Sequence, residues 1–168
     1  GADVIKVEPP QGDIMRHRGD DKNFTPGFVS VNRGKRSVVL DLKKPGAVPV
    51  LWKLIATADV FAQNFRPGVI ERLGFDADTV LARHPELVYL SISGVGRAGP
   101  YVKKRVYDPV VQALSGFAEI QGDPVSRRPK MIRTLIADKT TAVYASQAVL
   151  AALLARERSG KGQHVEVA

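Results

Sequence analysis

The chain has 168 residues, 25 of them basic and 17 acidic, and it contains no cysteine. This length suits one domain that buries roughly 70% of its unfolded surface, and 44% apolar residues exclude an intrinsically disordered chain. No apolar run approaches the ~20 residues that a membrane span needs. The absence of cysteine excludes disulfides, thiolate nucleophiles and cysteine-ligated zinc, and favours a reducing compartment such as the cytoplasm. The net charge of +8 indicates a polyanionic partner: nucleic acid, an anionic membrane surface or a phosphorylated cofactor.

Short β-rich runs alternate with helical stretches, which is typical of βαβ units. In chain order we expect a strand at 4–8, a polar loop at 11–32, a strand at 37–42, an amphipathic helix at 44–57 and a strand at 60–63. Strand patterns stand at both ends of the chain, at 1–7 and 163–168, so we expect it to be an excerpt of a longer protein.

The second half continues the alternation. Asp76 or Asp78 can cap a helix ending at Arg83, and a strand is expected at 87–93, followed by a basic glycine-rich loop at 94–105. Asp108 and Pro109 fit an N-cap and first residue for a helix at 110–118. After a loop at 121–131, a helix is expected at 137–158, with its C-cap in 159–162. The pattern predicts an α/β fold: a Rossmann-like open, mostly parallel sheet with flanking helices.

The segment GVGRAG at residues 94–99 matches the G-x-G-x-x-G dinucleotide fingerprint and follows a predicted strand. That fingerprint requires a helix to open among its glycines, so that the first amides can hold pyrophosphate. Here Pro100 and a run of basic residues follow at once. We therefore favour a loop that uses glycine for backbone conformations with positive φ.

Basic residues cluster at or near the ends of predicted strands, and these clusters can converge on one ligand-binding crevice. They are Lys35-Arg36, Lys43-Lys44, Arg66, Arg72 and Lys103-Lys104-Arg105. Nucleic-acid binding would favour basic residues interleaved with exposed aromatics or along one helix face. Aromatics are only 7% of the chain, and the long helix carries no basic stripe. A non-catalytic nucleic-acid-binding module is the alternative from another functional class.

Asp138 stands where an apolar run ends and the longest helix begins. The structural interpretation is an N-cap carboxylate that accepts hydrogen bonds from first-turn amides. The functional interpretation is a nucleophile or base, held ready at a crevice. His17, His84 and His164 lack the spacing of metal ligands and are expected to be structural or solvated.

Several motifs, taken in order and spacing, resemble one family. They are GADVIKVEPP at 1–10 with Gly12-Asp13, NRGKRS at 32–37 leading into LDLK at 40–43, ADV at 58–60, NFRPG at 64–68 with RLG at 72–74, SISG at 91–94 with Gly99-Pro100, YDP at 107–109 with Gln112-Ala113 and Ser115-Gly116, and GKGQ at 160–163. This combination resembles the class III CoA-transferases of the CaiB/BaiF type, which include formyl-CoA transferase and α-methylacyl-CoA racemase. The resemblance implies that residues 1–168 are the CoA-binding large domain, truncated at both ends, of a cytoplasmic enzyme that forms an interlocked homodimer.

The resemblance also implies roles for individual residues. Positions that contact the CoA nucleotide, its adenosine and its phosphates are matched by Leu40, Lys43, Asn64, Phe65, Arg66 and Arg72. The segment that runs along CoA toward its reactive end is matched by Lys104, Arg105, Val106 and Tyr107. Asp138 matches the catalytic aspartate. The implied partners are acyl-CoA and a carboxylic acid, without a metal, nucleic acid or membrane.

The implied chemistry agrees with the composition. Lysine and arginine bond well to the phosphates of CoA, and an aspartate can attack an acyl-CoA thioester to give first an anhydride and then aspartyl-CoA. Nearby backbone amides would stabilise the oxyanion. The racemase branch of the family has histidine where this chain has Tyr107, and this difference favours CoA transfer over racemisation. The alternative within the family is an acyl-CoA racemase or epimerase that uses Asp138 as base. Lys139-Thr140-Thr141 follow Asp138 where the family commonly has small, glycine-rich residues, so access to the carboxylate can differ.

Overall fold

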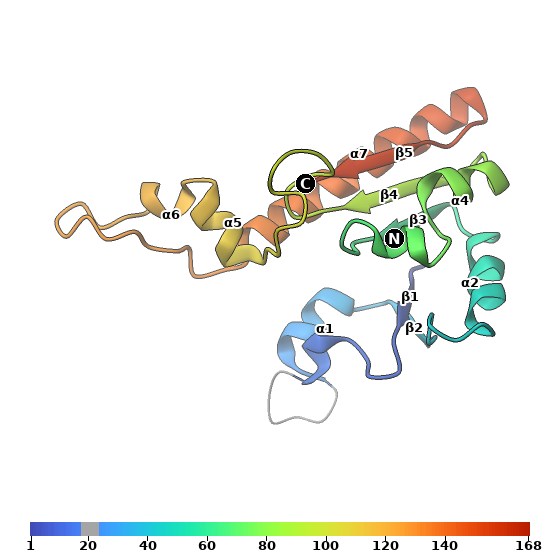
Figure 1. Cartoon of the computed structure of the whole chain (residues 1–168), viewed down its shortest axis with the longest axis horizontal. Helices are drawn as coiled ribbons and strands as arrows, with labels where there is room; N and C mark the ends of the chain where they lie inside the picture. Colours follow the sequence, from blue (N-terminus) through green and yellow to red (C-terminus); the bar gives the residue numbers. More distant parts are fainter. Residues whose placement is uncertain (18–23) are drawn as a thin grey trace. The chain divides into compact units, whose positions relative to one another are not determined.

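The structure is a computed structural model that describes residues 1–17 and 24–168. The chain divides into two compact units, Gly1–Leu54 and Ile55–Ala168, and each is described by itself (Figure 1). The strands of both units pair in parallel, so the predicted α/β class is confirmed. They form a two-stranded sheet in the first unit and a three-stranded sheet in the second.

In the first unit, strands β1 (Ile5–Glu8) and β2 (Arg36–Val39) pair with Ile5 opposite Arg36. The connection contains a 3-10 turn, η1 (Ile14–His17), and helix α1 (Pro26–Asn32). Helix α1 begins where the Thr25 hydroxyl accepts a hydrogen bond from the Phe28 N–H at 3.1 Å, with Pro26 at the first helical position. The expectation of a loop throughout 11–32 is therefore wrong, although residues 18–23 of that stretch lie outside the described residues. After β2, helix α2 (Ala47–Ile55) confirms the predicted amphipathic helix, with Leu51 and Ile55 buried on one face.

The second unit is built on the parallel sheet β3-β4-β5. Its strands are β3 (Val60–Gln63), β4 (Val88–Ile92) and β5 (His164–Val167), with Val60 opposite Val88 and Tyr89 opposite His164. The central strand β4 is buried from its first residue through Ser91. A strand buried on both faces reads as a continuous apolar run, which is why its position was visible in the sequence.

The helices of the second unit are α3 (Val69–Arg72), α4 (Ala77–Arg83), α5 (Asp108–Leu114), α6 (Phe117–Ile120) and α7 (Ile136–Ser159). Helix α7 runs alongside β4 and β5 (Figure 1). Two predicted caps are confirmed, because Asp76 accepts the Thr79 N–H at 2.9 Å and Gly160 ends α7 with a φ of 69°. The single helix predicted at 110–118 is instead two helices, because Gly116 adopts a left-handed φ of 78° between them.

The glycine-rich segment at 94–99 is a loop, as predicted, with φ of 83° at Gly96 and 92° at Gly99. Gly162, between α7 and β5, has a different role. Its N–H donates to the Pro85 carbonyl at 2.8 Å, and a Cβ built there would lie 1.8 Å from the Leu87 carbonyl oxygen. The backbone entering β5 therefore lies directly against the backbone entering β4. No helix within residues 1–17 and 24–168 is long and apolar enough to cross a membrane.

Candidate active site

Asp138 is the third residue of α7, in its first turn. The helix begins at Ile136, and Leu135 occupies the N-cap position without a side-chain hydrogen bond. The interpretation of Asp138 as the N-cap is therefore wrong. Its side chain is exposed and, within the described part of the chain, accepts no hydrogen bond. The carboxylate is thus available to a substrate.

The first-turn amides of α7 are bound instead by a side chain from α5. Asp108 is 3% exposed, and its Oδ2 accepts the Ala137 N–H at 2.7 Å and the Asp138 N–H at 3.2 Å. Asp108 was predicted to cap its own helix, which is also wrong: it is the first residue of α5, and Tyr107 occupies the N-cap position. The cap acts between helices, across 29 and 30 residues of sequence.

Gln112, one turn further along α5, completes this contact. Its Nε2 donates to Asp108 Oδ1 at 2.5 Å and to the Thr134 carbonyl at 3.3 Å, and its Oε1 accepts the Ile132 N–H at 2.9 Å. Gln112 is 3% exposed. The segment that leads into α7 is therefore fixed to α5 by side-chain bonds before Asp138 is reached.

The electrostatics of Asp138 differ from those of an ordinary first-turn carboxylate, which helix amides and the helix dipole stabilise in its charged form. Partial burial raises the pKa of the Asp138 carboxyl, and the negative charge of Asp108 raises it further. A carboxylate with a raised pKa is more basic, which suits it to act as a nucleophile or a base.

The candidate CoA-binding residues of the first unit follow β2. Leu40 donates its N–H to the Glu8 carbonyl at 2.9 Å and is half-buried. Lys43 is exposed, and its N–H donates to Asp41 Oδ1 at 3.1 Å in the turn after the strand. The Lys35-Arg36 cluster lies at the opposite, amino end of β2, where Arg36 pairs with Asp3 at 2.5 Å. Within the first unit, this cluster therefore lies at the opposite end of β2 from Lys43.

In the second unit, the exposed residues Asn64, Phe65 and Arg66 follow β3, and the exposed Arg72 ends α3. The Phe65 N–H donates to Gln63 Oε1 at 2.9 Å, which turns the chain sharply after the strand. The other candidate CoA-binding residues belong to the loop between β4 and α5. Lys104, Arg105 and Tyr107 are exposed there, and Val106 is half-buried.

Two contacts organise that loop. Val106 packs against Gly94, where an added Cβ would lie 2.0 Å from Val106 Cγ2. Lys104 Nζ stands 4.3 Å from the centre of the Tyr101 ring. The loop is therefore closed on itself at its base, and its basic tip is exposed.

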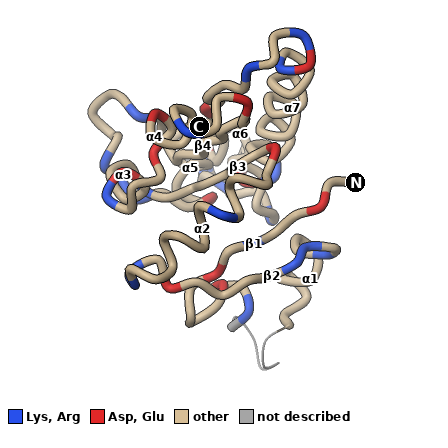
Figure 2. Tube along the Cα trace, turned by 90° about the vertical axis from the view of Figure 1, so that its right-hand side faces the viewer, with Lys and Arg blue, Asp and Glu red and all other residues tan. Residues whose placement is uncertain are grey.

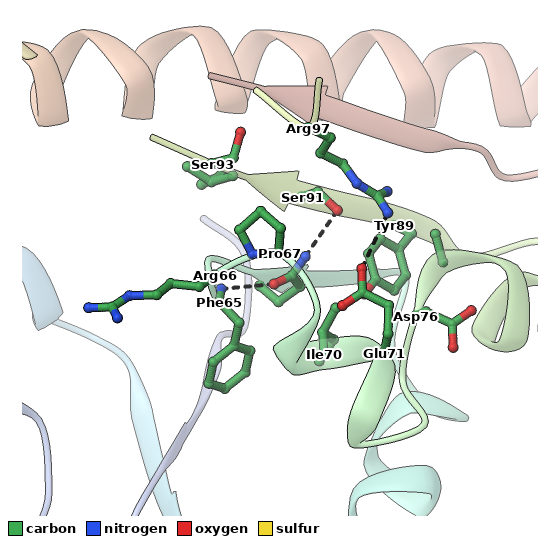
Figure 3. A pocket seen from close by; sticks show the side chains of 13 residues that line it. Phe65, Arg66, Pro67, Ile70, Glu71, Asp76, Tyr89, Ser91, Ser93 and Arg97 are labelled. Carbon is green, nitrogen blue, oxygen red and sulfur yellow. Dashed lines mark hydrogen bonds and ion pairs between the residues drawn. The ribbon is translucent and has the colours of Figure 1, made fainter. Parts of the chain in front are cut away.

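A depression opens at the carboxyl ends of β3 and β4 (Figure 3). Its lining is Gln63, Phe65, Arg66, Pro67, Ile70, Glu71, Asp76, Ala77, Tyr89, Ser91, Ile92, Ser93 and Arg97. Of the predicted site residues, it brings together Phe65 and Arg66, whose side chains extend away from the cluster of Ser91, Glu71 and Arg97 in Figure 3. The remaining predicted residues are outside this lining, among the residues that the structure describes.

The interior of the depression is a polar network that the sequence did not reveal. Ser91 Oγ accepts from Gln63 Nε2 at 3.0 Å and lies 2.9 Å from His164 Nε2. Arg97 bonds Glu71 at 3.3 Å and Glu166 at 3.0 Å. His164 is structural, as predicted, because it bonds Ser91 and packs edge-on against Tyr89.

Charged positions are spread over many elements of both units (Figure 2). Within residues 1–17 and 24–168, no three His, Asp or Glu side chains are grouped so that they could hold a metal ion. The first turn of α7 combines an exposed carboxylate, Asp138, with a buried acidic neighbour, Asp108.

Comparison with known proteins identifies the family. The family model described as CoA-transferase family III matches residues 1–168. The chain belongs to CoA-transferase family III. It is 40% identical to succinate–glutarate CoA-transferase of Agrobacterium fabrum, over 100% of this chain and 44% of that protein. It is 41% identical to acetyl-CoA:oxalate CoA-transferase of Acetobacter aceti, over 99% of this chain and 43% of that protein.

A solved structure of a CaiB/BaiF family protein from Brucella suis has the same fold. Its TM-score is 0.91 at 38% identity, and the match covers 98% of this chain and 45% of that one. The predicted family resemblance is confirmed. The chain spans less than half the length of these relatives.

Proposed function

We propose that the protein containing this chain moves CoA from an acyl-CoA donor to a carboxylic acid acceptor, with Asp138 as the nucleophile. The observation that carries the proposal is the exposed carboxylate of Asp138, unbonded within the described residues, in a chain of CoA-transferase family III. The names of the relatives agree with the reaction class. Residues 1–168 would form the CoA-binding large domain, and the enzyme would be a cytoplasmic, interlocked homodimer.

The reaction can be written from this one carboxylate. An Asp138 oxygen attacks the thioester carbon, so a C–O bond forms, the C–S bond breaks, and CoA leaves as the thiolate. The thiolate attacks the Asp138 carbonyl carbon of the anhydride, which releases the donor acid and leaves aspartyl-CoA. The acceptor carboxylate then displaces the thiolate from Asp138, forming a second anhydride. Attack of the thiolate on the acceptor carbonyl gives the new acyl-CoA and restores Asp138.

The tetrahedral intermediates need hydrogen-bond donors for the oxyanion. The amides nearest to Asp138 do not provide them, because the Ala137 and Asp138 N–H groups already donate to Asp108. The Lys139 N–H donates to the Leu135 carbonyl at 3.0 Å. The oxyanion donors must therefore come from outside the first turn of α7.

The phosphates of CoA would be bound by cations that the fold leaves unpaired. Among the described ion pairs, none includes the exposed side chains of Lys43, Arg66, Arg72, Lys104 or Arg105. Arg16, Arg36, Arg97 and Arg156, in contrast, are bound to carboxylates. Asn64, Phe65 and Leu40 would contact the nucleotide, and Val106 and Tyr107 the segment toward the thioester.

The decisive experiment is to trap the aspartyl intermediate in the intact protein. With acyl-CoA and hydroxylamine, we expect a hydroxamate at Asp138, located by peptide mass spectrometry. Asp138→Ala should lose both the adduct and at least about 10³-fold of the turnover. Asp78→Ala is the matched control, because Asp78 is also an exposed first-turn aspartate, in α4, and should behave as wild type. Normal turnover by Asp138→Ala would rule out the mechanism.

A racemase or epimerase that uses Asp138 as base is the second candidate, because a raised pKa also suits a base. Tyr107, which is 74% exposed, stands where that branch has histidine and argues against it. The two reactions differ in an isotope readout: solvent deuterium at the acyl α-carbon without exchange of CoA would favour racemisation.

A further inference from the structure

Asp108 occupies an unusual position for a carboxylate: it is buried, and its bonds run to a second helix. Its Oδ2 accepts the N–H groups of both Ala137 and Asp138. One of the two bonds therefore holds the backbone of the proposed nucleophile itself. A carboxylate cap between helices orients α7 relative to α5, and with it the backbone from which the Asp138 side chain projects.

Gln112 fixes the conformation of Asp108. The two residues are four positions apart on α5, so their side chains are neighbours on one face. The amide of Gln112 donates to Asp108 and simultaneously binds the backbone of Ile132 and Thr134. Because both side chains are buried, alternative rotamers would leave polar atoms unpaired. The contact therefore holds one arrangement of the segment at 132–138.

Asp108 also acts on Asp138 through its charge. Besides Asp138 itself, the titratable side chains of α5, of its N-cap and of the first turn of α7 are Asp108, Tyr107 and Lys139. Tyr107 is exposed, and Lys139 Nζ donates to Thr134 Oγ1 at 2.5 Å. Burial is the main cause that raises the pKa of the Asp138 carboxyl, and Asp108 is the charged group that raises it further. By taking the first-turn amides, it also removes donors that would otherwise stabilise a charged carboxylate at this helix end.

We propose that Asp108, oriented by Gln112, is a positioning residue for Asp138: it sets the direction of the nucleophile through the backbone of α7. Its buried negative charge also contributes to the raised pKa of the Asp138 carboxyl. The inference rests on the proposed function of Asp138. It assigns a role in the reaction to a buried residue that does not touch the substrate.

The test compares Asp108→Asn and Asp108→Ala with wild type in the intact protein. The pKa of Asp138 is measured by ¹³C NMR of aspartate-labelled protein, with Asp138→Asn used to assign the resonance. Asp108→Asn keeps an oxygen that can accept the Ala137 N–H but loses the charge, so the pKa of Asp138 should fall. Asp108→Ala loses the cap as well, and kcat should fall about 100-fold with KM for acyl-CoA within about twofold of wild type.

The outcomes separate the two proposals. An unchanged or higher pKa of Asp138 in Asp108→Asn overturns the role of Asp108, as does a loss in Asp108→Ala confined to KM. If neither variant folds, the titration of the wild-type protein decides, because a pKa of Asp138 at or below the ordinary ~3.9 is incompatible with the inference. Failure to trap any adduct on wild-type Asp138 overturns the proposed function instead, since the NMR titration does not depend on turnover.

Discussion

At the scale of single residues, the buried carboxylate of the first unit is Glu8, which is 2% exposed. It accepts Arg16 Nε and Nη2, each at 2.8 Å, and the Ser37 hydroxyl at 2.8 Å. The Arg16 guanidinium also stacks 4.0 Å from the centre of the Phe28 ring. Glu8 therefore joins β1, β2 and η1, and its partner Arg16 extends the contact to α1.

These bonds make the stability of the protein depend on pH. The hydrogen bond from Arg16 is the main cause that lowers the pKa of Glu8 from 4.5 to about 2. A depressed folded-state pKa contributes stability above pH 4.5 that is lost as the pH falls toward 2, here about 3 kcal/mol. Urea unfolding of Glu8→Gln should show this loss at pH 7 and converge with wild type near pH 2.

The matched control for Glu8→Gln is Asp3→Asn in the same unit. Asp3 also pairs with an arginine, Arg36, but both side chains are more than half exposed. Exposed pairs contribute about 0–1 kcal/mol, so this variant should unfold nearly as wild type does. An equal loss of stability in both variants would contradict the role assigned to the burial of Glu8.

At the scale of elements, the approach of β5 to β4 depends on Gly162. A Cβ at this position would overlap the Leu87 carbonyl, which is backbone and cannot rotate away. Gly162→Ala should therefore destabilise the protein by about 3 kcal/mol or more, measured as the free energy of unfolding in urea. Gly46→Ala is the control, since a Cβ there meets no atom within 4 Å and the backbone φ is not positive. An unfolding midpoint of Gly162→Ala equal to that of Gly46→Ala would disprove the steric argument.

Local signals in the sequence predicted several elements well. The short strand predicted at 60–63 has the observed bounds of β3, Asp76 caps the start of α4 as predicted, and Gly160 ends α7. Helix α1 was missed, although Thr25-Pro26 is a good local start signal, because the many turn residues around it favoured a loop.

The candidate active site was harder to predict than the helices and strands. The start of the longest helix drew attention to Asp138, and family resemblance matched it to the catalytic aspartate, but its neighbour Asp108 is 30 residues away, and no local pattern reports such a contact.

At the scale of the whole molecule, the chain covers 44% of the succinate–glutarate CoA-transferase that it resembles. The described residues include the proposed nucleophile and the candidate cations, but the amides nearest to Asp138 already donate to Asp108. We therefore expect the 168-residue chain alone to show no CoA transfer, assayed by chromatography of donor and product CoA thioesters. The intact protein, assayed in parallel, is the positive control. Turnover by the short chain would show that all catalytic groups lie within it.

The contact between Asp108 and the start of α7 has an evolutionary consequence. Because the Asp108 carboxylate binds the backbone N–H groups of Ala137 and Asp138 directly, the length of the loop at 121–131 does not by itself determine the position of Asp138. We therefore expect that insertions and deletions in that loop can accumulate while Asp138 stays in place. Natural variation in length should thus concentrate between α6 and Ile132, and the positions of Asp108 and Gln112 should resist it.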